Sequence, residues 1–202
     1  ALVFKSKTLP AAKFFDDKFL LHLIPGEQDD SKVVEEISAK LRQALKGPVR
    51  TDTPALGGIG VSGDVPSGLP TEAPVILVVG APGSHKEEYC RRIAKRYEGF
   101  VNLSMGEILR TSMDDNINDQ KWKSFFNTMN KGDLIPTEIC RELLYKSIHH
   151  HPQSWGYVIS GFPRTIEQAM DFERTVERLD LVILVDCTES FCLATIKERA
   201  GG

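Results

Sequence analysis

A glycine-rich turn that ends in a lysine is the part of this 202-residue sequence best equipped for chemistry. Residues 80–86 read GAPGSHK, directly after a run of β-branched residues and directly before a helical pattern. Such a turn can wrap a phosphate in backbone N–H groups and add the positive end of the following helix, while the lysine supplies a mobile positive charge. A plain surface turn without a ligand is the alternative. The candidate phosphate-binding residues are Gly80, Gly83, Ser84 and Lys86.

Three residues are expected to weaken the binding of phosphate by this turn. His85 stands before the lysine, where a glycine would allow a positive φ at no steric cost, whereas an L-residue loses roughly 1–2 kcal/mol there. Glu87 and Glu88 follow in the first helical turn, where carboxylates themselves suit the positive helix end. Each would repel a bound polyphosphate by on the order of 1–3 kcal/mol. We therefore expect the turn to be reshaped or occluded and polyphosphate binding to be weakened.

From residue 75 onward, short β-branched runs alternate with helical patterns, which is typical of βαβ units and a parallel sheet. The expected strands are 75–79, 100–103, 157–160 and 181–186. The expected helices are 86–97, 105–113, 121–130, 136–148, 165–179 and 189–199. Ligands of such folds bind at the carboxyl ends of the strands, so the functional residues are expected at that edge.

Two further regions precede this domain of residues 75–202. Residues 1–46 form an N-terminal arm in which apolar residues recur at helical spacing over 30–46, predicting an amphipathic helix. Before that helix, an apolar cluster between Phe14 and Leu23 has to dock, either on the arm's own domain or on a protein partner. Residues 47–74 are rich in glycine, proline, serine and threonine and predict a flexible linker.

The composition excludes several classes of protein. Hydrophobic residues make up 41% and the formal net charge is -3, which is ordinary for a folded protein and gives no general attraction to nucleic acid or anionic membranes. The longest apolar runs, 19–24 and 181–185, are far shorter than the roughly 20 residues of a membrane-spanning helix. The four cysteines lie in separate segments, which favours free thiols in a reducing, cytoplasmic compartment.

Four segments, in order, carry a family resemblance: GAPGSHK at 80–86, LSMGEILR at 103–110, KGDLIP at 131–136 and GYVISGFPRTIEQ at 156–168. Together they resemble the adenylate kinase family of nucleoside monophosphate kinases, over about residues 75–199. The resemblance implies an α/β three-layer P-loop fold with a parallel sheet. It also implies transfer of the γ-phosphoryl group of Mg-ATP to AMP.

The resemblance assigns roles to single residues. Lys86 matches the lysine that contacts the ATP phosphates, and Arg110 and Arg164 match the arginines that hold the AMP phosphate as bidentate donors. Lys86 and Arg164 are therefore the catalytic candidates. Gln168 matches the residue that reads adenine, which favours AMP over pyrimidine monophosphates. The remaining candidates on the AMP side are Gly106, Ile135 and Gly161.

The departures from the family pattern matter as much. Ser160 stands where family members carry an aspartate that helps to organise magnesium, so no metal ligand is expected in this chain. Met105 replaces a threonine beside the monophosphate. The family chain continues past the equivalent of Arg199 into an arginine-bearing lid, a last strand and a final helix, whereas this sequence stops at Gly202. The strand at 181–185 is therefore expected to be an exposed edge, so that either the sequence is a piece of a longer chain or a protein partner covers this edge.

Two functions remain in competition. In the first, which we favour, the domain is catalytically degenerate and serves as a docking or AMP-binding module in a larger assembly. In the second, it is an active adenylate kinase that binds AMP and Mg-ATP and whose lid lies in a longer chain. Phosphoryl transfer needs cations around the transferred group and closure against water, and both are weakened in this sequence.

Overall fold

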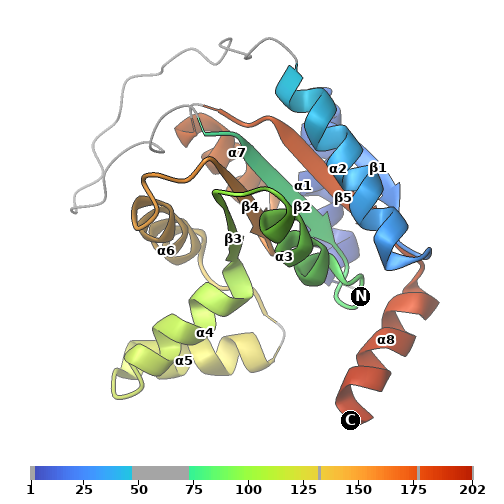
Figure 1. The fold of residues 1–202 in the computed structure, drawn as a ribbon. Helices are drawn as coiled ribbons and strands as arrows, with labels where there is room; N and C mark the ends of the chain where they lie inside the picture. Colours follow the sequence, from blue (N-terminus) through green and yellow to red (C-terminus); the bar gives the residue numbers. More distant parts are fainter. Residues whose placement is uncertain (1–2, 47–72, 132, 177, 202) are drawn as a thin grey trace.

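The computed structural model of the protein describes residues 3–46, 73–131, 133–176 and 178–201 (Figure 1). Its centre is a parallel sheet of five strands in the order β1-β5-β2-β4-β3. The last four strands along the chain confirm the expected ones to within a residue at each end. The strands are β1 (Leu21–Pro25), β2 (Val75–Gly80), β3 (Phe100–Ser104), β4 (Gly156–Ser160) and β5 (Leu181–Asp186).

Helices surround this sheet, and all six helices expected after residue 75 are present. The expected helix at 165–179 ends early, at Thr175, because the chain turns extended at Val176 on its way into β5. The amphipathic helix of the arm has the expected bounds. The helical elements are η1 (Phe4–Thr8), α1 (Leu9–Asp16), α2 (Asp30–Lys46), α3 (Lys86–Arg96), α4 (Met105–Asp115), α5 (Gln120–Asn130), α6 (Thr137–His149), α7 (Ile166–Thr175) and α8 (Glu189–Gly201).

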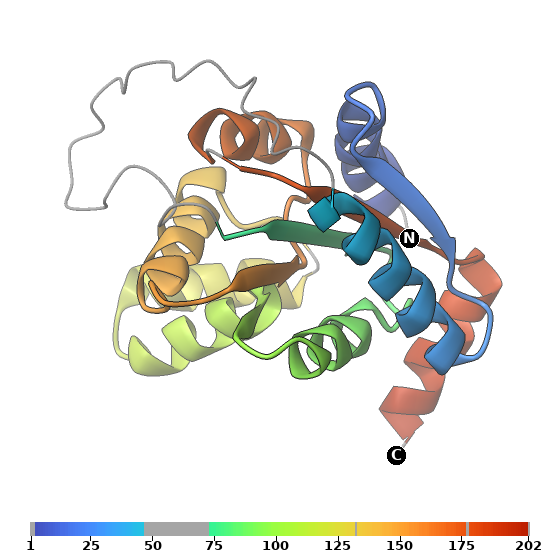
Figure 2. The same cartoon turned by 45° about the horizontal axis from the view of Figure 1, so that its top comes forward.

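The architecture has three layers, because the sheet buries both of its faces. Alternate residues of β2 point to opposite sides: Val75, Leu77 and Val79 join a core with α1, α6 and α7, whereas Ile76 and Val78 join a second core with α2 and α3. Figure 2 shows α1 and α7 on one side of the sheet and α2 and α3 on the other. Apolar runs without polar alternation are typical of strands buried in this way.

The N-terminal arm corrects one expectation from the sequence. The edge of β5 is not exposed, because β1 pairs with it in parallel from Leu21 opposite Val182 to Pro25 opposite Asp186. The prediction that a protein partner covers residues 181–185 was therefore wrong: the arm's own apolar cluster supplies the covering strand. The cluster has no regular alternation, so the sequence did not identify it as a strand or predict η1 and α1.

Two other expectations concern the rest of the chain. No helix among the described residues is long and apolar enough to cross a membrane. The linker prediction falls mainly on residues 47–72, which lie outside the described residues.

The pairing of β1 generates a stability prediction. Ile24 is 1% exposed and packs in the core with α2, whereas its neighbour Leu23 points outward and is 57% exposed. Ile24→Ala should lower the free energy of unfolding by about 2–5 kcal/mol, as for other buried isoleucines. Leu23→Ala, the matched control, should stay within about 0.5 kcal/mol of the parent protein. Urea denaturation measures both, and equal effects would contradict the burial of β1 on the sheet.

Candidate functional site

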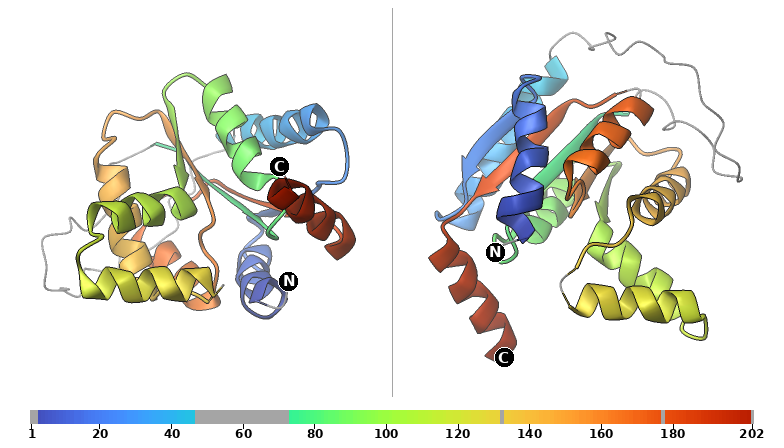
Figure 3. Two further views of the ribbon diagram at one scale, coloured as in Figure 1. Left: turned by 90° about the horizontal axis from the view of Figure 1, so that it is seen from below. Right: turned by 180° about the vertical axis from the view of Figure 1, so that it is seen from behind.

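The candidate residues gather where the central strands end. Because β2, β4 and β3 are neighbours in register, Ser160 at the end of β4 lies beside Val78 of β2 and Ser104 of β3. The turn at 80–86, the start of α4 and the turn at Gly161 therefore meet at one edge of the sheet. Figure 3 shows α8 on one side of this edge and the pair α4 and α5 on the other. The structure thus places these three segments at the carboxyl ends of the strands.

The phosphate-binding turn keeps a glycine-like path in spite of its histidine. Gly83 has a φ of +89° and His85 a φ of +59°, so His85 adopts the left-handed conformation itself. A Cβ added at Gly80 would lie 2.5 Å from Ser84 Oγ, and one added at Gly83 would clash with the backbone of Cys192. The turn is therefore tightly packed, and the strain of His85, roughly 1–2 kcal/mol, is retained in the fold.

An internal carboxylate already neutralises the candidate lysine. Lys86 is 8% exposed, and its Nζ lies 3.0 Å from Glu87 Oε1 and donates to the carbonyl of Ala81 at 3.3 Å. Burial alone would raise the pKa of the Glu87 carboxyl. The charge of Lys86 and its hydrogen bond outweigh burial, so that the pKa lies below its ordinary value. Glu87 is therefore ionised at neutral pH, beside the cation that a phosphate would need.

The second glutamate of the turn plays no part in this pairing. Glu88 points along α3, where its two carboxylate oxygens bind Arg91 at 3.3 Å and Arg92 at 2.9 Å. These hydrogen bonds lower the pKa of Glu88, although the group is exposed. The two glutamates looked equivalent in the sequence, and the structure separates them: Glu87 faces the lysine and Glu88 faces solvent-exposed arginines.

Two serines at the same edge have buried hydroxyl groups. Ser84 and Ser160 are both 0% exposed, and neither hydroxyl forms a hydrogen bond within the part of the chain that the structure describes. Buried polar atoms are nearly always paired, with protein groups, water or a ligand. The unpaired oxygen of Ser84, inside the turn, is therefore consistent with a site that receives a polar group.

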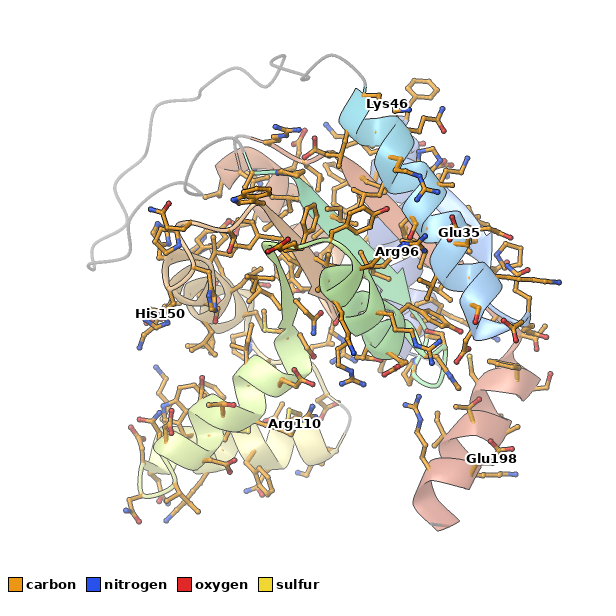
Figure 4. All side chains as sticks on the ribbon, viewed as in Figure 1. Glu35, Lys46, Arg96, Arg110, His150 and Glu198 are labelled. Atoms are coloured by element: carbon orange, nitrogen blue, oxygen red, sulfur yellow. The ribbon has the colours of Figure 1, made fainter. Side chains whose placement is uncertain are left out.

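The arginines of the candidate monophosphate side differ from Lys86 in their ion pairing. Neither Arg110 nor Arg164 forms an ion pair with a carboxylate among the described residues. Arg110 is exposed on α4, where Figure 4 marks it, and its guanidinium lies 3.6 Å from the position of a Cβ on Gly106. Gly161, with a φ of +74°, in turn approaches the backbone of Gly106. Arg110, Gly106 and Gly161 thus form one continuous surface.

Arg164 is the more unusual of the two cations, because it is half-buried. Burial lowers the pKa of its guanidinium, which still remains charged at neutral pH. Taking a cation out of water is unfavourable unless an anion compensates for the lost solvation. The charge of Glu87 acts on Arg164 without forming an ion pair with it, so the guanidinium keeps its hydrogen-bond donors for an anionic ligand.

The structure places the other two AMP-side candidates in structural roles. Gln168 is 2% exposed, its Oε1 accepts a hydrogen bond from the backbone N–H of Arg164 at 2.8 Å, and its own N–H donates to Thr165 Oγ1 at 3.2 Å. Thr165 is the N-cap of α7, and Gln168 reaches past it to the N–H of the preceding residue, so the two hydrogen bonds fix the start of α7 and the backbone of Arg164. Ile135 is buried in the core between the sheet and α6. The adenine contact expected of Gln168 and the AMP-side role expected of Ile135 stay predictions.

The residues present do not fit a magnesium site built by the protein. Magnesium prefers carboxylate and water oxygens in octahedral geometry. At the position of the family aspartate this chain offers the buried hydroxyl of Ser160, and no group of three His, Cys, Asp or Glu side chains in the described ranges could hold a metal ion. Of the carboxylates near this edge, Glu87 is paired with Lys86, and Asp30 is bonded to Tyr89 and Arg92.

One residue of the site was missed from the sequence. Asp30, the first residue of α2, contacts the phosphate-binding turn and the helix that follows it, through His85, Tyr89 and Arg92. It lies 59 residues before Tyr89 in the chain, on the far side of the linker. An aspartate at a helix start is an ordinary capping residue in any sequence, so no local signal could have found it.

Comparison with known proteins gives the family. A family model described as adenylate kinase matches residues 78–199. Adenylate kinase isoenzyme 5 of Bos taurus is 35% identical over 126 residues, which is 62% of this chain and 22% of that protein. Uridylate kinase of Saccharomyces cerevisiae is 32% identical over 136 residues, 66% of either chain, and adenylate kinase isoenzyme 1 of Rattus norvegicus is 34% identical over 116 residues, 57% of this chain and 58% of the relative.

These matches set the extent of the likeness. The chain spans about a fifth of the length of the first of these relatives and about two thirds or less of the other two. The family match, by contrast, covers more than half of this chain and includes the phosphate-binding turn and both arginines. With its parallel sheet and the convergence of these residues at one edge, this chain belongs to the adenylate kinase family.

Proposed function

We propose that this chain is a catalytically degenerate adenylate kinase domain that binds AMP and serves as an AMP-binding or docking module in a larger assembly. One observation carries the proposal: the cations of the two half-sites are in opposite states. Lys86 on the ATP side is paired with Glu87 at 3.0 Å, whereas Arg110 and Arg164 on the AMP side have no carboxylate partner among the described residues.

The AMP side has the properties of an anion site that is ready to bind. Hydrogen bonds from an arginine to a phosphate are charge-assisted and frequently bidentate. A phosphate at Arg164 would also compensate for the solvation free energy that its guanidinium loses on burial. The hydrogen bonds that Gln168 forms with the backbone of Arg164 and with Thr165 keep this segment in place before any ligand binds, which reduces the entropy lost on binding.

On the ATP side, a polyphosphate would have to displace Glu87 from Lys86 or accept its repulsion. At separations of several Å this repulsion is on the order of 1–3 kcal/mol, or roughly a factor of five to more than a hundred in affinity. The exchange of the family aspartate for Ser160 removes a second contribution on the same side. The changes that weaken ligand binding therefore lie on the side of the site where ATP and its metal would bind.

The active enzyme is the second candidate, and a specific observation favours it. His85 adopts the left-handed conformation that a glycine would adopt at this position. The backbone of the phosphate-binding turn therefore keeps a conformation that could hold a ligand. The relatives that share this region are named adenylate and uridylate kinases. In this alternative the lid lies in a longer chain, Lys86 and Arg164 act on the transferred phosphoryl group, and Mg-ATP is the phosphoryl donor.

Separate binding measurements distinguish the two candidates. Isothermal titration calorimetry with AMP should give a measurable dissociation constant, and the same experiment with Mg-ATP should give weaker binding or none. AMP should also bind more tightly than UMP if Gln168 reads adenine as proposed. Equal binding of AMP and Mg-ATP would favour the active enzyme, and binding of neither would overturn the proposal of an AMP module.

The internal ion pair gives a sharper prediction. Glu87→Gln removes the charge beside Lys86 and should strengthen ATP binding by roughly five to a hundred times, according to the repulsion that it relieves. Glu88→Gln is the matched control, because Glu88 pairs with Arg91 and Arg92 instead, and its effect should be much smaller. Calorimetry with ATP measures both variants. If they behave alike, the Glu87 carboxylate is not what weakens the site.

The AMP side is tested through its half-buried arginine. Arg164→Met should weaken AMP binding by about ten to a hundred times, the effect of losing charge-assisted hydrogen bonds to a phosphate. Arg174→Met is the control: Arg174 lies on the same segment, but its side chain binds only the carbonyl of Met170 among the described residues. Unchanged AMP affinity in the Arg164 variant would place the monophosphate elsewhere.

A further inference from the structure

The first residue of α2 brings the N-terminal arm into contact with the phosphate-binding turn. Asp30 Oδ1 accepts a hydrogen bond from the hydroxyl of Tyr89 at 2.9 Å, and Oδ2 lies 3.5 Å from a guanidinium nitrogen of Arg92. The same Oδ1 lies 3.9 Å from Nδ1 of His85. The Asp30 carboxylate thus contacts His85, near the end of the phosphate-binding turn, and also Tyr89 and Arg92 in the first two helical turns of α3.

His85 is enclosed by three different elements. Its ring stacks on Tyr89 of α3 with centroids 6.3 Å apart and lies 6.1 Å from the ring of Phe191 on α8, while Asp30 of α2 faces its Nδ1. His85 is also one of two non-glycine residues with positive φ among those described. Such a conformation persists only where the surroundings hold it, and here the surroundings include the arm.

The position of Asp30 is fixed by the sheet rather than by the turn that it contacts. Directly before it, the backbone N–H of Gly26 donates to the carbonyl of Asp186 at 2.7 Å, and the carboxylate of Glu27 accepts from the backbone N–H of Thr188. The acceptor, Asp186, is the last residue of β5, and the donor, Thr188, follows the strand directly. The start of α2 is therefore anchored to the end of β5 through β1, and Asp30 reaches the turn from this fixed point.

We infer that Asp30 is a positioning residue of the phosphate-binding turn. The N-terminal arm thereby contributes to the structure of the candidate nucleotide site. Through Tyr89 and His85, Asp30 keeps the turn in the conformation in which His85 has a positive φ. This inference goes beyond the proposed function, because it concerns the shape of the turn whether or not a nucleotide binds there.

Hydrogen exchange of the turn tests the inference directly. The backbone N–H groups of Ser84, Glu88 and Tyr89 are hydrogen-bonded within the turn and the start of α3. In Asp30→Ala, mass spectrometry should show exchange of a peptide spanning residues 80–89 that is faster by about tenfold or more, as for the loss of a hydrogen bond to a charged group. A peptide spanning residues 100–115 should be unaffected.

Glu35→Ala is the matched control. Glu35 is also a carboxylate of α2 that pairs with α3, through Arg96 at 2.7 Å, but at the opposite end of α3 from the turn (Figure 4). It should leave exchange of residues 80–89 unchanged. Asp30→Asn keeps an acceptor for Tyr89 and should show the same localised effect to a smaller extent. Equal effects of Asp30→Ala and Glu35→Ala, no effect of Asp30→Ala, or a rise spread evenly over all peptides in both Asp30 variants would overturn the inference.

Binding of inorganic tripolyphosphate separates this inference from the proposed function. The proposed function predicts that Glu87→Gln binds tripolyphosphate more tightly than the parent protein, and failure of that gain contradicts the proposed function alone. Where the gain is present, adding Asp30→Ala should reduce it severalfold, and adding Glu35→Ala should not. A gain that survives the Asp30 change would contradict the positioning role alone.

Discussion

The structure depends on β5 being paired on both sides. A parallel strand buried on both faces is stable only if its backbone hydrogen bonds are satisfied at both edges, and β2 and β1 supply the two partners. The pairing with β2 aligns the phosphate-binding turn with the end of β5. The pairing with β1 draws the arm into the domain and places α2 against α3. The contacts of Asp30 with the phosphate-binding turn and α3 follow from this arrangement.

The charges at the carboxyl edge of the sheet are distributed unequally. Lys86 and Glu87 satisfy one another, so the ATP side is neutral before any ligand is present. Arg164 is half-buried and forms no ion pair with a carboxylate among the described residues, although the charge of Glu87 also acts on it. Because a half-buried cation gains from an anion, we propose that the electrostatic affinity for phosphate is greater on the AMP side than on the ATP side.

His85 shows how a fold retains a residue that the local backbone disfavours. Its left-handed conformation is unfavourable by roughly 1–2 kcal/mol, a penalty that a glycine would avoid. Rings from α3 and α8 and a carboxylate from α2 surround the imidazole. The strain is thus offset by contacts with three elements, two of which lie far from the turn in the sequence.

The sequence by itself determined the family, the four central strands, the helices between them and the convergence of Lys86, Arg110 and Arg164 at one edge. These features depend on local periodicity and on motifs whose residues are close together in the chain, so their physical causes are visible without coordinates. The tertiary structure alone decided that β1 completes the sheet, that Glu87 rather than Glu88 neutralises the lysine, and that Asp30 contacts the turn. Strand pairing across the linker and the direction of a side chain depend on packing between distant segments, which no local pattern encodes.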